Sequence, residues 1–271
     1  MAGSSILLKE EGNRHFQAGN YVGAEGCYSK AIIADPKNAA LYTNRALARL
    51  KLQLYDSVID DCQRCLELKP GNMKAYYYLS QAQLALRDYD AALQNALRAH
   101  EICAVTADKS LGAVTSQVLS CKKARWEDRE RRRIREGIEL ENETLALLER
   151  EKAAMLAGVE SELERRDIET EWDQKIAAMK RTFEAARAAD SKRREVPDWA
   201  IDEIGFGIMV DPVITKTGKS YERASIMEHL RRSPTDPLTR EPLVASELRP
   251  NLGLKQACEE FLEENGWAVD W

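Results

Sequence analysis

Long apolar runs are missing from this 271-residue sequence, since no stretch approaches the roughly 18 consecutive apolar residues of a membrane span. An excess of positive charge is missing as well, because 40 Lys and Arg stand against 45 Asp and Glu, giving a net charge of −5. The first residues lack the basic segment followed by an apolar one that marks a secretory signal. We therefore expect a cytoplasmic protein, with the nucleus left open as a second location, that binds neither nucleic acid nor membrane.

Residues that could hold a metal ion are few and scattered. The chain has three histidines, and its six cysteines follow no framework spacing: Cys27, Cys62, Cys65, Cys103, Cys121 and Cys258. Without an export signal, such cysteines are expected to be reduced. Cys62 and Cys65 fall on packing positions of a predicted helix and are expected to be core thiols. His15 and His100 have no Cys or His at ligand spacing, so we assign them structural or surface roles and expect no metal site and no cofactor.

An internal repeat is present in the first third of the chain. Tyr21, Tyr55 and Tyr89 recur at one constant interval, and Pro36 and Pro70 are separated by the same interval. Small or short side chains recur at Ala24, Val58 and Ala92, where paired helices must approach closely. Together with Gly12, Tyr28 and Ala31, these positions resemble the tetratricopeptide family, with three repeats over about residues 5–104. The resemblance implies stacked helix pairs whose first helices line a concave groove.

Polar residues on those first helices could face the groove. The candidates are Lys9 and Asn13 in the first repeat, Asn44 and Lys51 in the second, and Lys74 in the third, with Tyr77 and Tyr78 beside Lys74 as an aromatic wall or as packing residues. Cationic and amide donors that converge are what a C-terminal carboxylate requires. The set is similar to the carboxylate clamp of chaperone-binding tetratricopeptide proteins. That resemblance implies acidic C-terminal tails of the seventy- and ninety-kilodalton heat-shock chaperones as ligands.

The stretch from 122 to 195 has no proline and is dense in Glu, Arg, Lys and Ala, a composition typical of long helices. One apolar stripe comprises Leu145, Leu148, Met155, Val159 and Leu163, and a second comprises Ile168, Trp172, Ile176, Met179 and Phe183. With Gly158 near the changeover, the pattern favours an antiparallel hairpin turning at about 157–161, and one unbroken helix is the alternative. Acidic neighbours of the arginine run at 129–135 favour a solvated helix over a nuclear-targeting or nucleic-acid segment.

A new module begins where Pro197 ends the helical pattern. A first loop leads into a short hairpin at about 208–222, followed by a helix over about 224–232, a proline-rich loop at 233–242, and a last helix over about 252–265 that Asn251 can cap. The segments Ile208-Met-Val-Asp-Pro-Val213, Asp236-Pro-Leu-Thr239 and Pro250-Asn251 resemble the U-box family. The resemblance implies a small α+β fold that is a metal-free relative of the RING domain.

This module has too few Cys and His residues for zinc sites, and it has no cysteine with the surroundings of a nucleophile. Zinc in a RING domain needs eight Cys or His ligands, and the segment has only His229 and Cys258. We expect hydrogen bonds and ion pairs to hold the loops instead, among residues such as Asp211, Ser220, Glu222, Arg240 and Asn251. Cys258 lies at a core-facing position beside acidic residues, unlike an activated thiolate, so no covalent catalytic residue is expected.

The resemblance to the U-box family implies catalysis by positioning, and the roles of individual residues follow from the same resemblance. It implies that Ile204, Phe206 and Ile208 in the first loop and Pro237 in the second dock a ubiquitin-conjugating enzyme. It also implies that Arg240 contacts both that enzyme and ubiquitin, while His229 supports the surface. A ubiquitin-protein transferase of this kind orients a charged enzyme so that a substrate lysine attacks its thioester.

The whole order resembles the chaperone-associated U-box ubiquitin ligases. We predict a mainly α protein: a tetratricopeptide solenoid over 5–121, a charged helical hairpin over 122–195 and a U-box over 196–271. The family completes its clamp after the third repeat with an aromatic and an acidic residue, whereas this chain runs from Val105 to Ala113 with Asp108 and Leu111 as imperfect substitutes. The partners implied are heat-shock chaperones, conjugating enzymes, misfolded clients and a second copy of the chain. A chaperone adaptor without transfer activity and a self-assembling scaffold are the alternatives.

Overall fold

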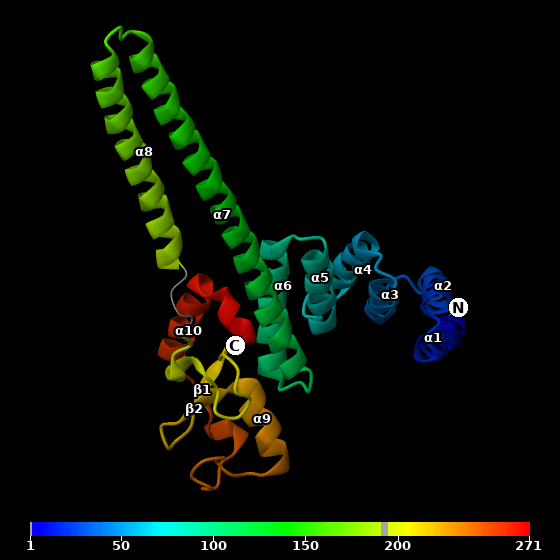
Figure 1. The fold of residues 1–271 in the computed structure, drawn as a ribbon. Helices are drawn as coiled ribbons and strands as arrows, with labels where there is room; N and C mark the ends of the chain where they lie inside the picture. Colours follow the sequence, from blue (N-terminus) through cyan, green and yellow to red (C-terminus); the bar gives the residue numbers. More distant parts are fainter. Residues whose placement is uncertain (1, 191–194) are drawn as a thin grey trace. The chain divides into compact units, whose positions relative to one another are not determined.

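The structure is a computed structural model that describes residues 2–190 and 195–271. Residues 1–126 and 196–271 form one compact unit, and residues 127–195 form a second. Each unit is described by itself. Figure 1 shows the order of the elements, which is mainly helical with one small sheet.

Three helix pairs make up the first part of the chain. They are α1 (Ala2–Gln17) with α2 (Tyr21–Ala34), α3 (Ala39–Lys51) with α4 (Tyr55–Leu68), and α5 (Met73–Ala85) with α6 (Tyr89–Thr106). The second helix of each pair begins at one of the three regularly spaced tyrosines. Side-chain caps mark most starts: Asn20 accepts from the amide of Gly23 at 2.9 Å, and Asn72 accepts from that of Ala75 at 3.3 Å.

Small side chains let the paired helices approach. Ala24, Val58 and Ala92 are fully buried, as the repeat pattern predicts. Gly12 serves the same purpose, because a Cβ there would lie 2.6 Å from Cε1 of Tyr28. The tetratricopeptide prediction is therefore confirmed. Cys62 and Cys65 are buried among Val58, Leu79 and their neighbours, so they are core thiols as expected.

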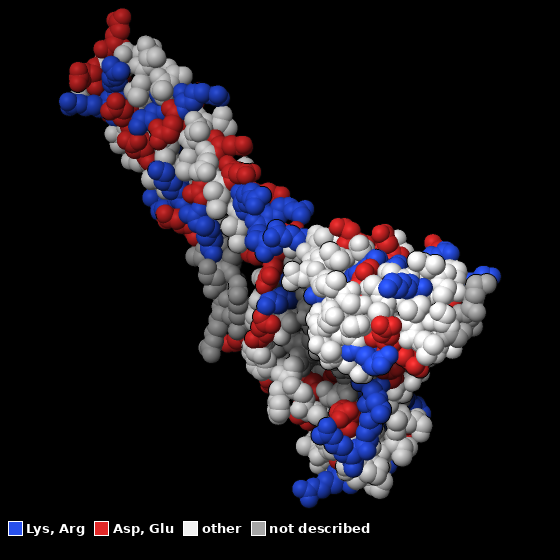
Figure 2. Space-filling view, turned by 90° about the vertical axis from the view of Figure 1, so that its right-hand side faces the viewer, with Lys and Arg blue, Asp and Glu red and all other residues white. Residues whose placement is uncertain are grey.

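The second unit contains most of the long helices α7 (Leu111–Ala157) and α8 (Glu162–Asp190), which form an antiparallel hairpin (Figure 1). Lys152 pairs with Asp173 at 2.6 Å, and Arg187 pairs with Glu141. Trp172 and Ile176 are buried in the seam. Lysine, arginine and acidic side chains alternate over its surface (Figure 2). The hairpin is confirmed over the single helix.

Two residues of the predicted apolar stripes lie outside this seam. Met155 is about half exposed and Leu163 is 75% exposed. Met155 lies in the last turn of α7 and Leu163 in the first turn of α8, on either side of the connection between the helices. Near such a tip a helix has little of its partner to pack against, so these two members of the stripe remain exposed.

The C-terminal module has a three-stranded antiparallel sheet in the order β2-β1-β3, with Val213 opposite Tyr221 and Pro250. Its elements are η1 (Asp198–Ala200), β1 (Pro212–Ile214), β2 (Ser220–Glu222), α9 (Arg223–Arg232), η2 (Ala245–Glu247), β3 (Arg249–Pro250), α10 (Leu252–Glu264) and η3 (Gly266–Asp270). Asn251 caps α10 by accepting from the amide of Leu254 at 3.1 Å. The order of loop, hairpin, helix, loop and helix matches the prediction.

This module packs on the repeats within the first unit. Val210 belongs to a buried cluster with Ala92, Leu93, Ala96, Val118 and Cys121, and Leu119 of α7 packs against the core of the module. The indole Nε1 of Trp126 donates to the carbonyl of Glu264 at 2.9 Å. A Cβ at Gly266 would lie 2.4 Å from that of Trp126, so only glycine allows this approach.

Candidate functional site

The first helices of two repeats bring two of the predicted clamp asparagines together. Asn13 on α1 and Asn44 on α3 meet through a hydrogen bond from Nδ2 of Asn44 to Oδ1 of Asn13 at 3.5 Å. The hydroxyl of Tyr28 donates to the same oxygen at 2.8 Å. With Oδ1 accepting twice, the Nδ2 group of Asn13 is left as a donor, which is the polarity that a carboxylate requires.

The cationic candidates lie on the same three first helices. Lys9 stands one turn before Asn13 on α1, and Lys51 stands two turns after Asn44 on α3. Lys51 and Lys74 are exposed and Lys9 is partly buried. Their ammonium groups make no hydrogen bond or ion pair with any residue that the structure describes. They are therefore available to an anionic ligand.

Tyr77 has a packing role in addition to any contact with a ligand. Its ring centroid lies 5.8 Å from that of Tyr78, and it packs against the buried cluster of Ala99, Cys103, Leu111 and Val114. Leu111 thus belongs to the wall behind Tyr77. Asp108 remains at the surface, where Lys74 is one of the groups that lower its pKa, after the hydrogen bonds from Ser110.

Arg45 and Arg49 of α3 form a network that sequence reasoning missed. Their guanidinium groups pair with the buried carboxylate of Asp61 at 2.6 and 3.0 Å, and Arg49 also pairs with Glu25 at 2.7 Å. Burial raises the pKa of Asp61 and the two arginines oppose that rise. The network ties α2, α3 and α4 together and so fixes the helix that carries Asn44 and Lys51.

The described residues include one group of three side chains with metal-ligand atoms, and His15 belongs to it. The packing of α1 on α2 brings Cys27 to Glu11 and His15, with the candidate ligand atoms within 4.8 Å of one another. His15 and Cys27 lie on different helices, and their wide separation in the sequence hides this contact. Nδ1 of His15 lies 3.3 Å from Nδ2 of Asn20, so the Asn20 amide already occupies one ring nitrogen. His100, by contrast, is buried and bonded to Thr115 at 3.1 Å, a structural role as expected.

In the C-terminal module, the first loop is folded around Asp202. Its buried carboxylate accepts from the amide of Gly205 at 2.7 Å and from that of Glu222 at 3.0 Å. The backbone of Phe206 has φ +54°, and its ring is 73% exposed. A left-handed conformation at a bulky residue costs energy, so the loop geometry holds this ring outward against a local preference.

The other predicted docking residues are placed differently. Ile204 is half buried against Val213, Tyr221, Ile226 and Leu243. Ile208 is only 5% exposed and belongs to the core with Met209 and Leu262. Ile208 can therefore support a docking surface from beneath but offers little area to a partner.

The second loop is folded around Asp236, whose carboxylate is also buried. Its neighbours at the surface are Pro237, which is partly buried, and Leu238, which is 55% exposed. Arg240 has φ +61° and an exposed side chain with no bond to any residue that the structure describes. Arg240 therefore does not hold the loops together as expected, and its guanidinium takes no part in the hydrogen bonds and ion pairs between the module's described residues.

The remaining expected contacts between the loops and the hairpin are present. Glu222 accepts from the amides of Val210 and Asp211 at 2.7 and 2.9 Å, and Asn251 donates to Ser220 at 3.0 Å. Asp211 pairs with Arg223 at 2.5 Å. The ring of His229 meets the carbonyl of Thr235 at 2.9 Å, which ties α9 to the second loop.

The thiol of Cys258 lies in the core of the module. Burial raises the pKa of Cys258 to about 11, and Glu222 adds to the rise. A thiol of this kind is protonated at neutral pH and shielded from reaction partners, the opposite of an activated nucleophile. The module thus presents a surface built from two loops, with its cysteine in the interior.

Comparison with known proteins agrees with this architecture. The family model described as U-box domain matches residues 196–267. The E3 ubiquitin-protein ligase CHIP of Arabidopsis thaliana is 31% identical over 264 residues, which cover 96% of this chain and 94% of that protein. The chain belongs to the CHIP family of U-box E3 ubiquitin-protein ligases. Its membership in a ligase family with a U-box confirms the predicted fold class and transferase activity.

Other relatives match a smaller part of this CHIP-family chain. RNA polymerase II-associated protein 3 of Xenopus tropicalis is 40% identical over 91 residues, 34% of this chain and 14% of that protein. A solved structure of the first TPR of Spaghetti (RPAP3), bound to the HSP90 peptide SRMEEVD, is 30% identical with a TM-score of 0.43, covering 46% of this chain and 94% of that one. None of the described helices is long and apolar enough to cross a membrane.

Proposed function

We propose that this ligase is a co-chaperone that holds the acidic C-terminal tails of seventy- and ninety-kilodalton heat-shock chaperones in its repeat groove. The observation that carries the proposal is the hydrogen-bonded pair of Asn13 and Asn44, in which Oδ1 of Asn13 accepts twice and its Nδ2 remains a donor. Lys9, Lys51 and Lys74 would supply the charge, and Tyr77 an aromatic contact. Membership in the CHIP family supports the same class of ligand.

The second half of the proposal concerns the transfer of ubiquitin from a conjugating enzyme to a client protein. Ile204, Phe206, Pro237 and Arg240 would dock a ubiquitin-charged conjugating enzyme, with Ile208 supporting them. A client held by the chaperone would then present its lysines to the thioester, so that misfolded proteins are ubiquitinated for quality control in the cytoplasm or the nucleus. The exposure of Phe206 and Arg240 and the buried thiol of Cys258 support docking over covalent catalysis.

A homodimer is part of the proposal, because the connector exposes apolar residues such as Ile134, Ile138 and Leu147. Light scattering at micromolar concentration should then give about twice the chain mass of 30.6 kDa. A monomer that is fully active would contradict this part.

Calorimetry tests the proposed binding of the tail, with the HSP90 peptide SRMEEVD as free acid and as C-terminal amide. The free acid should bind, and the amide should bind poorly, because a charged acceptor is lost. Lys9→Ala should weaken binding by about 2 kcal/mol, the range for a hydrogen bond to a charged group. Equal affinity for the two peptides would refute the clamp.

A further inference from the structure

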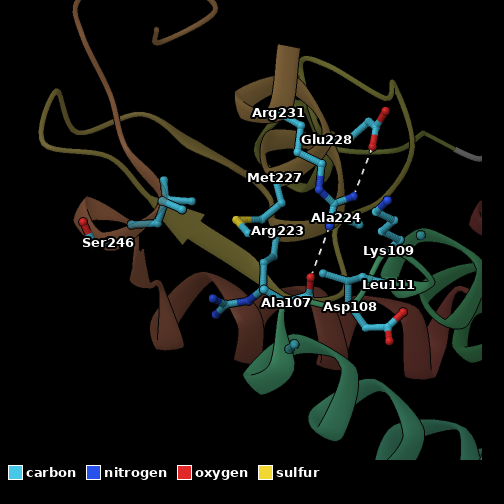
Figure 3. Close-up of a pocket in the computed structure, with 14 residues that line it drawn as sticks. Ala107, Asp108, Lys109, Leu111, Arg223, Ala224, Met227, Glu228, Arg231 and Ser246 are labelled. Atoms are coloured by element: carbon cyan, nitrogen blue, oxygen red, sulfur yellow. Dashed lines mark hydrogen bonds and ion pairs between the residues drawn. The ribbon is translucent and has the colours of Figure 1, made fainter. Parts of the chain in front are cut away.

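A pocket of about 390 Å³ lies where the repeats meet the U-box (Figure 3). One wall is the end of α6 and the start of α7, including Ala104, Asp108 and Leu111. The opposite wall is α9, with Met227 and Arg231, and Leu248 follows η2 on the same side. The pocket thus has one wall from the domain proposed to hold the tail and one from the domain that acts in transfer.

The lining of the pocket combines apolar side chains with three cationic ones, Lys109, Arg223 and Arg231. Arg231 donates from Nη2 to the carbonyl of Ala107 at 3.2 Å and pairs with Glu228 at 3.3 Å (Figure 3). A guanidinium has five N–H donors, so donors remain for a ligand. Lys109 makes no hydrogen bond or ion pair with a described residue.

The acidic groups of the rim are already engaged. Asp108 accepts from the amide of Ser110 at 2.8 Å at the start of α7. Glu228 is shared by Arg231 and Arg232. An entering anion therefore meets the ammonium group of Lys109 and the guanidinium groups of Arg231 and Arg223, of which Arg223 is paired with Asp211 at 2.5 Å, while the nearby carboxylates are compensated.

The pocket adjoins a helix that carries predicted clamp residues. Met73 and Tyr77 of α5 pack in the same cluster as Leu111 of α7 and Ala224 of α9. Asp108 lines the pocket, and its pKa is lowered first by the hydrogen bonds from Ser110 and then by the charges of Lys74 on α5 and Arg231 on α9. A peptide whose carboxylate lies between α1 and α3 would run past α5, and its preceding residues would reach Asp108 and Lys109.

We propose that this pocket receives an acidic stretch of the bound tail that precedes the C-terminal carboxylate, with Lys109 and the U-box residue Arg231 facing its side chains. The proposal rests on the proposed function. It adds that the U-box itself takes part in recognising the tail, so that a bound tail bridges the two domains. Met227 and Leu248 provide apolar area for the non-acidic residues of the same stretch.

The experiment uses the full chain and three free-acid peptides: SRMEEVD alone, SRMEEVD preceded by four glutamates, and SRMEEVD preceded by four serines. The glutamate extension should bind about fivefold more tightly than the serine extension, as expected for two partly exposed charge pairs. The double variant Lys109→Ala with Arg231→Ala should remove this advantage and leave the affinity for SRMEEVD unchanged. Arg232→Ala is the matched control, because Arg232 also pairs with Glu228 but does not line the pocket.

Each outcome bears on a different proposal. If the wild type binds all three peptides with equal affinity, or if Arg232→Ala removes the advantage as fully as the double variant, the pocket is not the acidic subsite. If no free acid binds better than its amide, the clamp itself fails, and the inference fails with it. The circular-dichroism spectrum and unfolding temperature of each variant verify that affinity changes are not losses of fold.

Discussion

Asp202 and Asp236 occupy equivalent positions in the two loops of the U-box. In each loop the amide of the aspartate donates to the carbonyl five residues later, at 2.8 Å in both, and its carbonyl accepts from the amide four residues later, at 2.8 and 2.9 Å. Each carboxylate accepts from the amide three residues later, at 2.7 and 3.1 Å. The residues flanking each loop form an isolated antiparallel bridge. The two loops are therefore one motif used twice.

The equivalence of the two loops explains why two of the docking candidates, Phe206 and Arg240, are exposed. Phe206 and Arg240 are both the fourth residue after the aspartate, and both have a left-handed backbone, with φ of +54° and +61°. The motif places that residue at the apex of the loop, and one loop carries an aromatic ring there while the other carries a guanidinium. In this module the side chains of Asp202 and Asp236 hold the loops by hydrogen bonds, where a RING domain uses zinc, because one carboxylate can accept several amide hydrogens.

Asp236→Ala is expected to destabilise the U-box. The carboxylate accepts from the amides of Leu238 and Thr239 at 2.9 and 3.1 Å and from the hydroxyls of Tyr221 and Thr217 at 3.1 Å each. Leaving these donors buried without an acceptor should cost about 3 kcal/mol. Urea unfolding followed by tryptophan fluorescence measures this loss.

Asp198→Ala is the control for that substitution, since Asp198 is an exposed aspartate of the same module. It should change the free energy of unfolding by less than about 0.5 kcal/mol. Equal stability of the Asp236 variant and the wild type would show that the second loop is held by other contacts.

The sequence predicted the repeats closely because their period is local. Each second helix begins at a tyrosine of the repeat pattern, and the small residues at Ala24, Val58 and Ala92 are needed wherever such helices cross. The limits of the three domains at 121 and 195 stay a prediction. The contacts of Trp126 with Glu264 and of Val210 with α6 join residues that are far apart in the chain, and no periodic signal encodes them.

The sequence indicated several residues of the candidate site, but it could not indicate which side chains contact one another there. Asn13 and Asn44 were selected by their helix positions, whereas the role of Tyr28 in orienting Asn13 depends on how α2 packs. Asp202 was missed because a single aspartate in a loop has no distinctive pattern. Ile208 follows the motif of the docking loop, yet the bridge from Ile201 to Ile208 turns its side chain into the core.

Tyr28→Phe tests whether Asn13 is oriented for the tail. Without the phenolic hydroxyl, Oδ1 of Asn13 loses its shorter hydrogen bond, and the amide can rotate away from the donor orientation. The affinity for the free-acid peptide should fall about fivefold, close to the value of one net hydrogen bond. Calorimetry with the free acid and the amide separates this effect from a general loss of binding.

Tyr42→Phe is a matched control for Tyr28. The hydroxyl of Tyr42 donates to the carbonyl of Pro36 at 3.1 Å, so the same chemical change removes a hydrogen bond of similar length away from Asn13. Both variants should lose similar stability, but only Tyr28→Phe should lose affinity. Equal affinity in the two variants would remove Tyr28 from the clamp.

Phe206→Ala and Pro237→Ala are expected to reduce ubiquitin transfer more than tenfold. Both residues lie on the surface formed by the two loops, where a buried contact at the centre of a small interface often contributes about 2 kcal/mol. Transfer is measured with a purified conjugating enzyme, and tail binding should be unaffected. Leu252→Ala is the control, as Leu252 is an apolar residue of similar exposure, 72%, on α10. Full activity of the Phe206 and Pro237 variants would overturn the docking surface.

Arg240→Ala should separate orientation from affinity. In the proposed docking its exposed guanidinium would contact both the conjugating enzyme and ubiquitin, and it has no bond to a described residue that its loss would break. The variant should retain most binding of the conjugating enzyme and slow the discharge of its thioester about tenfold or more, since positioning acts on the rate. A parallel loss of binding and discharge would assign Arg240 to affinity instead.

His100 should make the first unit less stable as the pH falls below neutrality. Burial lowers the pKa of this imidazole from 6.5; Asp211 opposes the shift, while Lys255 and Arg223, also in the U-box, add to it. The unfolded chain therefore takes up a proton near pH 6.5 that the folded chain accepts only at lower pH, so stability present above pH 6.5 is lost as the pH falls towards the folded pKa.

Urea unfolding at several pH values between 7.5 and 5 measures the slope of the free energy of unfolding against pH. His100→Gln keeps a polar group for Thr115 but cannot titrate, so its slope over this range should be smaller than that of the wild type. Identical slopes for the two proteins would show that His100 is not the group responsible.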